Sequence, residues 1–420
     1  MKKTALILFV IAIVFSNAAA QDIEKEYIFL IKKYNQIPIE ETDRDKFSLM
    51  ANEIDRFLSN YPEYYKNDEL LFIQGLMFEK SRNLDNSILS FFKTVRLFPG
   101  TAKKEKAIEN LRRIFSRNKE TELYKEIILR EVIKDIGDVQ FKKRFYSYLK
   151  DFNGINYGGF SSFLIKDAYV YLSKFEVENK DEIYVFIGDW YFRKDDSERA
   201  LFIYSMVEEV FENSLFVPYA MLSRGNLLEN PLNLHQEALE VLREMILKFP
   251  EHPSIIQARL IRGDIYENKL KDYIQAIAEY KMIVAQFPED KRCADALFQA
   301  SKIYRKKLKD YLKAIEHLEK LYIDYPSDLQ AHIAVHLVGE IFEKDLDDYQ
   351  MAVVNYSKVI DLYPGSEYAF KDLEKAAELA EKKLKNNSQA IELYRKYIEK
   401  SSNDKQKEKF ERKIRQLQGN

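Results

Sequence analysis

The chain has 420 residues, with 66 Lys and Arg against 68 Asp and Glu, for a formal net charge of -2 at pH 7. Its hydrophobic fraction of 46% is enough to bury a core, which excludes an intrinsically disordered chain, and the balanced charge argues against a dedicated nucleic-acid-binding protein. The chain contains only 12 glycines but 28 tyrosines and 28 phenylalanines, and this glycine-poor composition favours helix.

The first 20 residues predict an export signal. Lys2 and Lys3 precede an apolar run over residues 5–15, and Ala18 and Ala20 supply the small side chains that a signal peptidase reads. The run is too short to span a bilayer. We therefore expect cleavage before Gln21 and a periplasmic or secreted protein. A lipid anchor needs Cys directly after the cleavage site, so none is expected, and no other stretch is apolar for long enough to span a membrane.

Three series of residues repeat with a period of 38 through the rest of the chain. The first holds small residues, at Gly225, Gly263, Ser301, Gly339 and Ala377. The second is almost entirely alanine, at Ser162, Ala200, Ala238, Ala276, Ala314, Ala352 and Ala390. The third is proline after an aromatic residue, at Pro250, Pro288, Pro326 and Pro364. Such a register indicates structural repeats.

Each repeat predicts a helix, a turn and a second helix. Ala276, Tyr280 and Ile283 lie at i, i+4 and i+7, which places them on one stripe of a helix. Pro288 then ends that helix, because proline lacks the N–H group and restricts the preceding residue. Gly263 lies on the preceding helix, where a small side chain lets the two helices approach closely. Neither helix buries its face alone, so neighbouring repeats must stack.

The pattern resembles the signature of the tetratricopeptide repeat (TPR) family. Gly263 and Tyr266, then Ala276 and Tyr280, then Pro288 take the family's small, aromatic, Ala and Pro positions, although the period is 38 rather than 34. Long periods ending in Phe-Pro or Tyr-Pro look like those of bacterial envelope proteins of this family. The resemblance implies an all-α, right-handed superhelical solenoid of about ten helix–turn–helix repeats with a C-terminal capping helix.

We divide the chain by how well the repeats keep the pattern. The predicted parts are the signal peptide (1–20), N-terminal degenerate repeats (21–150), a Gly-rich loop or hinge (151–162), C-terminal repeats (163–402), and a capping helix with its tail (403–420). The Gly-rich loop contains Gly154, Gly158 and Gly159. It is not predicted to hold phosphate, because no strand precedes it and no Lys-Ser/Thr pair follows it.

The sequence contains few candidates for catalytic or metal-ligating residues. His332, His336 and Glu340 are one helical turn apart and could together face a metal ion, but a solvated helix face is the interpretation we favour. Cys293 has no evident histidine partner, so we interpret it as a small half-buried residue. No catalytic residue, metal site or cofactor is predicted, and we do not expect an enzyme.

The TPR resemblance implies a binding surface on the concave groove, lined by the first helix of each repeat. The positions three before the small residue are Val185, Leu222, Leu260, Phe298, His336 and Glu374. The positions one after it are Asp189, Asn226, Asp264, Lys302, Glu340 and Glu378. The centre is apolar and the flanks are mostly acidic, which suits a protein segment with apolar anchors and basic flanks.

The sequence thus predicts a non-catalytic scaffold or adaptor that binds proteins of the bacterial cell envelope. The alternative is an accessory solenoid for peptidoglycan or carbohydrate handling. Sugar binding favours exposed tryptophan platforms, and Trp190 is the chain's single tryptophan, expected in the core of its repeat.

Overall fold

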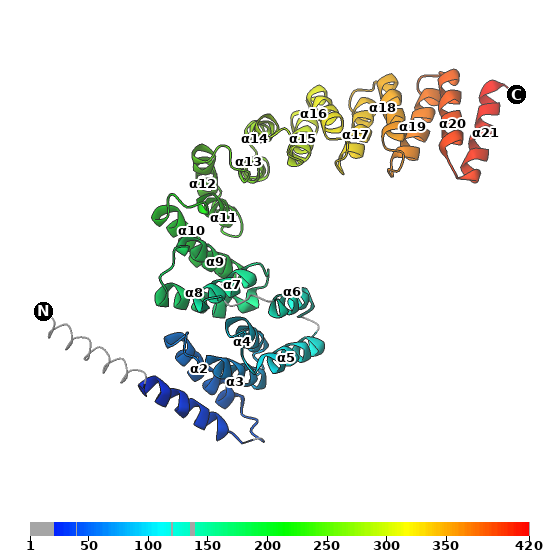
Figure 1. The fold of residues 1–420 in the computed structure, drawn as a ribbon. Helices are drawn as coiled ribbons and strands as arrows, with labels where there is room; N and C mark the ends of the chain where they lie inside the picture. The colour runs from blue at the N-terminus through cyan, green and yellow to red at the C-terminus, as the bar shows by residue number, and fades with distance from the viewer. Residues whose placement is uncertain (1–20, 39, 119–120, 135–138, 420) are drawn as a thin grey trace. The chain divides into compact units, whose positions relative to one another are not determined.

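The computed structural model describes residues 21–38, 40–118, 121–134 and 139–419, and these residues form helices, turns and loops without a strand. The expected all-α fold of helical repeats is confirmed. The predicted export signal lies outside the described residues. Of the helices in the described ranges, none combines the length and apolar character that a membrane crossing demands. The chain divides into two compact units, Met1–Ala220 and Met221–Asn420, which we describe in turn (Figure 1).

The first unit opens with a helical stretch over residues 21–35. Its further helices are α2 (Arg44–Asn60), α3 (Asn67–Lys80), α4 (Leu84–Leu97), α5 (Lys104–Arg117), α6 (Glu122–Ile133), α7 (Phe141–Asn153), η2 (Gly158–Phe160), α8 (Ser161–Lys174), α9 (Lys180–Arg193) and α10 (Ser197–Val210). Helix α11 (Val217–Glu229) crosses the boundary between the units.

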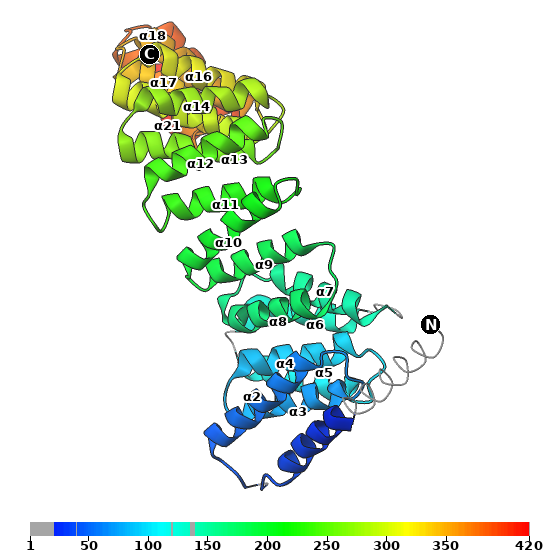
Figure 2. The ribbon, with the colours of Figure 1, turned by 90° about the vertical axis from the view of Figure 1, so that its left-hand side faces the viewer.

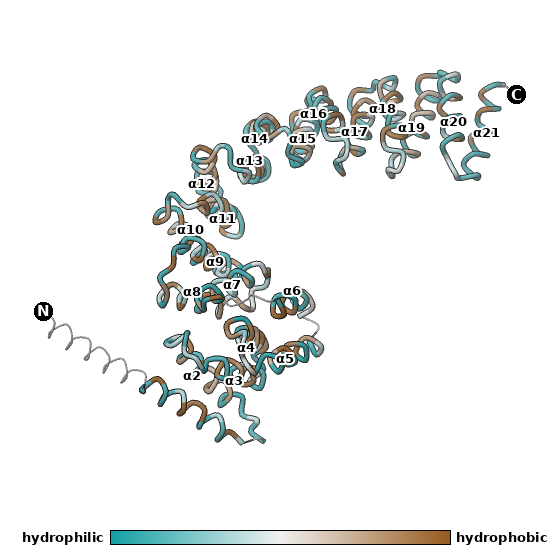
Figure 3. The backbone as a smooth tube through the Cα atoms, in the orientation of Figure 1, coloured by the Kyte–Doolittle hydropathy of each residue, from teal (hydrophilic) through white to brown (hydrophobic). Residues whose placement is uncertain are grey.

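The second unit continues with helices that pack on their neighbours in chain order (Figure 1). Figure 2 shows the same ribbon turned by 90°. They are α12 (His235–Lys248), α13 (Ile255–Asp264), η3 (Ile265–Leu270), α14 (Tyr273–Gln286), α15 (Arg292–Ile303), η4 (Tyr304–Leu308), α16 (Tyr311–Asp324), α17 (Ala331–Lys344), α18 (Tyr349–Leu362), α19 (Ala369–Lys382), α20 (Asn387–Lys400) and α21 (Asp404–Gln418). Apolar and polar residues alternate around these helices (Figure 3). The helices of this unit form the pairs α11 and α12, α13 and α14, α15 and α16, α17 and α18, and α19 and α20. We call the first helix of each pair the A helix and the second the B helix.

The 38-residue period fixes where each B helix begins and ends. The N-cap residues Asp272, Asp310, Asp348 and Asn386 each accept a hydrogen bond from the backbone N–H three residues further on. Helices α12, α14, α16 and α18 each end two residues before one of the repeated prolines, as the sequence predicts. The repeated alanines Ala276, Ala314, Ala352 and Ala390 are fully buried between the helices, as the pattern predicts.

The A helices end with a residue in the left-handed conformation, again every 38 residues. Lys271, Lys309, Asp347 and Lys385 have φ between 54° and 58°. In α13 and α15 the chain first passes through the π-helical turns η3 and η4. A left-handed residue closes the last helical turn and reverses the chain direction. The turn geometry is therefore shared by successive repeats even though glycine is not used there.

The repeated small residues lie directly under a side chain of the following B helix. A Cβ atom at Gly263 would come within 2.5 Å of the Tyr280 ring, and one at Gly339 within 2.7 Å of the Tyr356 ring. In the repeat between them, the small position is Ser301 and the residue 17 positions later is Leu318, which has no ring. Glycine is not reserved for a ring partner, however, because a Cβ atom at Gly225 would come within 2.5 Å of Leu242.

The close contact between Gly339 and the Tyr356 ring predicts non-additive stability changes. Gly339→Ser should lower the free energy of unfolding by about 1–3 kcal/mol, because the added atoms push against the Tyr356 ring. In a Tyr356→Leu background, which copies the Ser301 and Leu318 pair, the same substitution should cost clearly less. Denaturant unfolding of the four chains measures both costs. Equal costs in the two backgrounds would contradict the contact.

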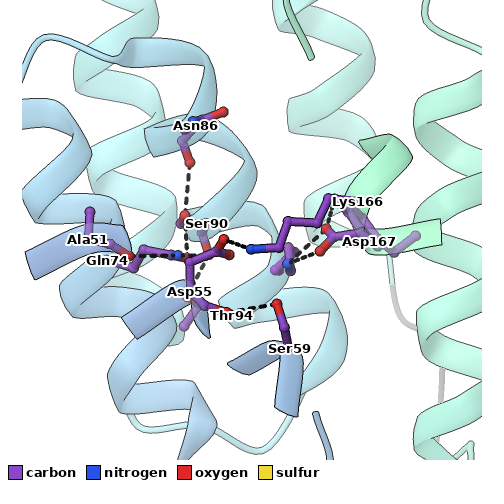
Figure 4. A network of polar contacts seen from close by, with 11 residues as sticks. Ala51, Asp55, Ser59, Gln74, Asn86, Ser90, Thr94, Lys166 and Asp167 are labelled. Carbon is purple, nitrogen blue, oxygen red and sulfur yellow. Dashed lines mark hydrogen bonds and ion pairs between the residues drawn. The ribbon is translucent and has the colours of Figure 1, made fainter. Parts of the chain in front are cut away.

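The first unit departs from simple stacking, because α8 packs back onto helices far earlier in the chain. Lys93 of α4 lies 2.8 and 3.0 Å from the two carboxylate oxygens of Asp167, and both residues are buried. Lys166 contacts Asp55 of α2, as Figure 4 shows. Tyr148 of α7 donates a 2.7 Å hydrogen bond to Asp167. Buried charges are tolerated here because each has an opposite partner.

The Gly-rich loop predicted at 151–162 lies in this first unit, where Gly158–Phe160 form the short helix η2 and the flanking residues belong to α7 and α8. A Cβ atom at Gly158 would lie 2.2 Å from the carbonyl oxygen of Arg193, and one at Gly159 would lie 2.3 Å from an Asp85 carboxylate oxygen. The two glycines therefore allow the loop to pack closely against α9 and α4. The role of this loop as a hinge, and the division of the chain at 151–162, stay predictions.

Candidate partner-binding surface

A cleft of about 550 Å³ lies on the A-helix side of the second unit, between α15 and α17. It brings together three of the predicted groove residues, Phe298, Lys302 and Glu340. The other residues that line it are Ser301, Arg305, Lys306, Lys309, Leu318, Ile333, Leu337 and Asp345. We call this the A-side cleft.

The floor of the A-side cleft is apolar. Phe298 of α15 and Leu337 of α17 are half-buried and pack against the core of the unit, and Ile333 lies one turn before Leu337. Residues four apart on a helix share a face, so Ile333 and Leu337 form one apolar strip opposite Phe298. Such a floor can take an apolar side chain of a partner and shield it from water.

The charges of the A-side cleft differ from the predicted acidic flanks. Arg305 lies 2.7 Å from Glu340 and 2.7 Å from Asp345, and Lys344 also contacts Glu340. Burial opposes the ionisation of Glu340, but hydrogen bonds from Lys344 and Arg305 outweigh it and lower its pKa to about 2. The acidic groups are thus neutralised within the protein.

The net charge at the rim is therefore positive. Lys306 and Lys309 are exposed, and Lys302 lies over the Phe298 ring at 6.0 Å. Further along, Glu374 is paired with Lys409 and Glu378 with Lys382. The expectation of a partner with basic flanks is wrong for this cleft, because the sequence did not reveal which acids find internal partners. The rim suits acidic groups instead.

His336 is held away from this cleft by contacts with α19. Its Nδ1 lies 2.9 and 3.0 Å from the Asp372 oxygens, and its ring stacks on Tyr368 at 4.1 Å. The favoured interpretation of a solvated helix face is therefore wrong for His336. His332 also lies beside Tyr368, at 5.9 Å between ring centres. The described residues contain no group of three or more His, Cys, Asp or Glu arranged to hold a metal.

The remaining groove residues are spread over both units. Val185 and Asp189 are buried, and Asp189 accepts hydrogen bonds from Tyr204, Tyr219 and Asn153. These two residues serve the core of the first unit, so their placement on a binding surface is corrected. Leu222 and Leu260 are half-buried, whereas Asn226 and Asp264 are exposed in the second unit.

The cleft residues that sequence reasoning missed include Ile333, Leu337, Lys306 and Lys309. The prediction used two positions of each A helix, three before and one after the small residue. Ile333 and Leu337 are six and two positions before Gly339, and the two lysines follow Ser301 by five and eight. Extending the same helical face by one turn would have found Ile333, Leu337 and Lys306, whereas Lys309 lies two turns on, at the left-handed residue that ends the A helix.

Two further predictions concern single residues. Cys293 is fully buried rather than half-buried, its thiol lies 3.1 Å from the Phe287 carbonyl oxygen, and burial raises its pKa. It is therefore a packing residue at the start of α15. Trp190 is also fully buried, as expected, so it cannot serve as an exposed platform for a sugar.

The low pKa of Glu340 predicts a pH-dependent contribution to stability. A carboxylate whose pKa is lowered in the folded state stabilises the protein above its ordinary pKa of 4.5, and this contribution is lost as the pH falls from about 5 to about 2. Glu340→Gln should therefore lower the free energy of unfolding at pH 7 and make little difference near pH 2. Denaturant unfolding at several pH values measures this. The exposed Glu392→Gln serves as the control, and a constant difference at all pH values would refute the pairing.

Comparisons with known proteins concern the helical repeats. A family model described as soluble NSF attachment protein, SNAP, matches residues 282–413. No curated protein matches the chain. Among solved structures, MamA residues 41 to the end from Desulfovibrio magneticus RS-1 is 22% identical, with 46% of this chain and 99% of that chain covered and a TM-score of 0.34.

Two other solved structures are similar at lower identity. A tetratricopeptide repeat protein from Parabacteroides merdae ATCC 43184 is 16% identical, covers 66% of this chain and 99% of its own, and has a TM-score of 0.36. The C-terminal part of a TPR repeat-containing protein from Cytophaga hutchinsonii is 15% identical, with 62% and 97% covered and a TM-score of 0.42. These are likenesses of fold, and the candidate surface rests on the contacts of this chain's own residues.

Proposed function

We propose that this chain, whose helix pairs are tetratricopeptide-type repeats, is a non-catalytic scaffold that binds a protein segment in the A-side cleft. The observation that carries the proposal is the combination of an apolar floor and a positive rim in one cleft of about 550 Å³. An extended segment with one apolar anchor and nearby acidic residues fits that combination. The anchor supplies affinity, and the lysines orient the segment.

We place this activity in the bacterial cell envelope. Residues 1–20 read as an export signal, and the mature chain would act in the periplasm or outside the cell. Partner binding without catalysis agrees with the ion pairs of the cleft, because the Glu340 carboxylate, whose pKa is lowered, is held by Arg305 and Lys344. A group held in this way is poorly suited to move protons.

The proposal predicts which substitutions abolish partner capture. Phe298→Ser with Leu337→Ser should reduce capture from the native envelope fraction by about 30-fold or more, because the apolar anchor loses its floor. Lys306→Glu with Lys309→Glu should reduce capture and weaken its dependence on salt. Quantitative pull-down with the mature chain measures both effects, and circular dichroism checks that helicity is retained.

Leu362→Ser is the matched control, since Leu362 is an exposed apolar residue of α18 outside the cleft. It should leave capture unchanged. Equal capture by the wild type and the Phe298 and Leu337 variant would mean that the partner uses another surface. Absence of the chain from the envelope fraction would refute the proposed location.

A further inference from the structure

A second cleft, of about 250 Å³, lies on a different side of α15 from the A-side cleft. Helix α15 contributes Ala296, Leu297 and Ala300 to it, whereas Phe298, Ser301 and Lys302 face the A-side cleft. The remaining lining comes from the two flanking B helices, with Tyr280, Lys281, Val284 and Ala285 of α14 and Glu316, His317 and Lys320 of α16. We call this the B-side hollow.

The preceding repeat fills the same place with an ion cluster. Arg259 and Arg262 of α13 each lie 2.7 Å from the buried carboxylate of Glu279, and Arg262 also donates a 2.7 Å hydrogen bond to the Leu239 carbonyl. Exactly one period later, the three positions are occupied by Leu297, Ala300 and His317. The following repeat has three buried residues there: Val335, Val338 and Asn355. Ala300, which lines the hollow, is therefore the smallest residue found at its position in these three repeats.

His317 gives the hollow a defined hydrogen-bonding character. Its Nδ1 lies 2.8 Å from the Lys313 carbonyl oxygen, and a carbonyl only accepts, so Nδ1 carries the proton. Burial lowers the pKa of His317, which keeps the ring neutral at pH 7. The other nitrogen, Nε2, is then an acceptor. The ring is packed against Tyr304 at 5.0 Å between ring centres, which fixes its position.

The walls and the rim restrict what the hollow can take. Val284, Leu297 and Ala300 form apolar walls suited to a flat hydrocarbon surface. At the rim, Lys281 and Lys320 are exposed and outnumber the exposed Glu316, so the local charge is positive. A guanidinium group would be repelled there. A neutral ring that carries one donor and has an acidic neighbour is the matching ligand.

We propose that the B-side hollow binds a tryptophan side chain of a partner protein, with an acidic residue of that partner next to it. The indole N–H is a donor without acceptor capacity, which complements the acceptor Nε2 of His317. The bicyclic ring covers the apolar walls, and the acidic residue meets Lys281 and Lys320. This site goes beyond the proposed function, because it lies on another side of α15 and uses none of the residues of the A-side cleft.

The proposal is tested by calorimetric titration of the mature full chain with two small probes. Indole-3-acetate carries the ring, the N–H donor and a carboxylate, and 1-methylindole-3-acetate lacks only the donor. We expect saturable binding of indole-3-acetate with a dissociation constant of roughly 1 mM, as suits so small a ligand. The methylated probe should bind about tenfold more weakly, because Nε2 is left without a partner.

Two variants address the site itself. Ala300→Val introduces the side chain that the following repeat already carries at Val338, and it should abolish binding by filling the hollow. His317→Leu removes the acceptor and should make the two probes bind equally weakly. Phe298→Ser, in the A-side cleft, should leave probe binding unchanged, so failure of this inference is separable from failure of the proposed function.

Three results would overturn the inference: no saturable heat with indole-3-acetate, equal affinity for both probes in the wild type, or undiminished binding in Ala300→Val. Thermal melting of each variant shows whether it is folded. If Ala300→Val does not fold, the comparison of the two probes in the wild type and in His317→Leu still decides the matter.

Discussion

The contact between a small residue of one helix and a bulky residue of the next is the constraint on which the second unit depends. Gly263 under Tyr280 and Gly339 under Tyr356 allow each A helix to lie close to its B helix, and the buried alanines do the same from the other side. The contact recurs every 38 residues, so each hairpin offers its neighbour an equivalent surface. Capping by Asp272, Asp310 and Asp348 keeps the helix starts in the same register.

Differences between equivalent residues of successive repeats create the two candidate binding clefts. Where one repeat has Arg262, the next has Ala300, and a hollow opens beside His317. On another side of the same helix, Phe298 lies opposite the apolar strip of α17 that Ile333 and Leu337 form. Helix α15 thus contributes to two clefts of different chemistry, one with a positive rim around an apolar floor and one with a single acceptor among apolar walls. Both depend on the rigid spacing of the repeats around them.

The fold was largely predictable from the sequence because its signals are local and repeated. Helix ends before Pro288 and Pro326, burial of Ala276 and Ala314, and the turn between the helices all follow from patterns within a few residues. The first unit was harder to predict, since Lys93 meets Asp167 across 74 positions and Lys166 meets Asp55 across 111. A pairing between distant residues leaves no periodic trace in the sequence.

The candidate site was predictable only in part for a related reason. Phe298, Lys302 and Glu340, three of the groove residues that the TPR resemblance implied, do lie in one cleft. The charge of the surface was misjudged, because the partners of Glu340 come from an adjacent turn of α17 and from the previous repeat, at Arg305. The burial of Asp189 likewise depends on tyrosines of other helices. Counting charges along one helix face does not show which of them remain available to a partner.

The most direct test of equivalent, stackable hairpins is the removal of one complete unit in register. Deleting residues 292–329 takes away α15, η4 and α16 and brings α17 next to α14 in the place of α15. If the hairpins are interchangeable, circular dichroism should show unchanged helicity per residue and a cooperative thermal transition. A chain that loses helicity per residue, or melts without a transition, would contradict the account.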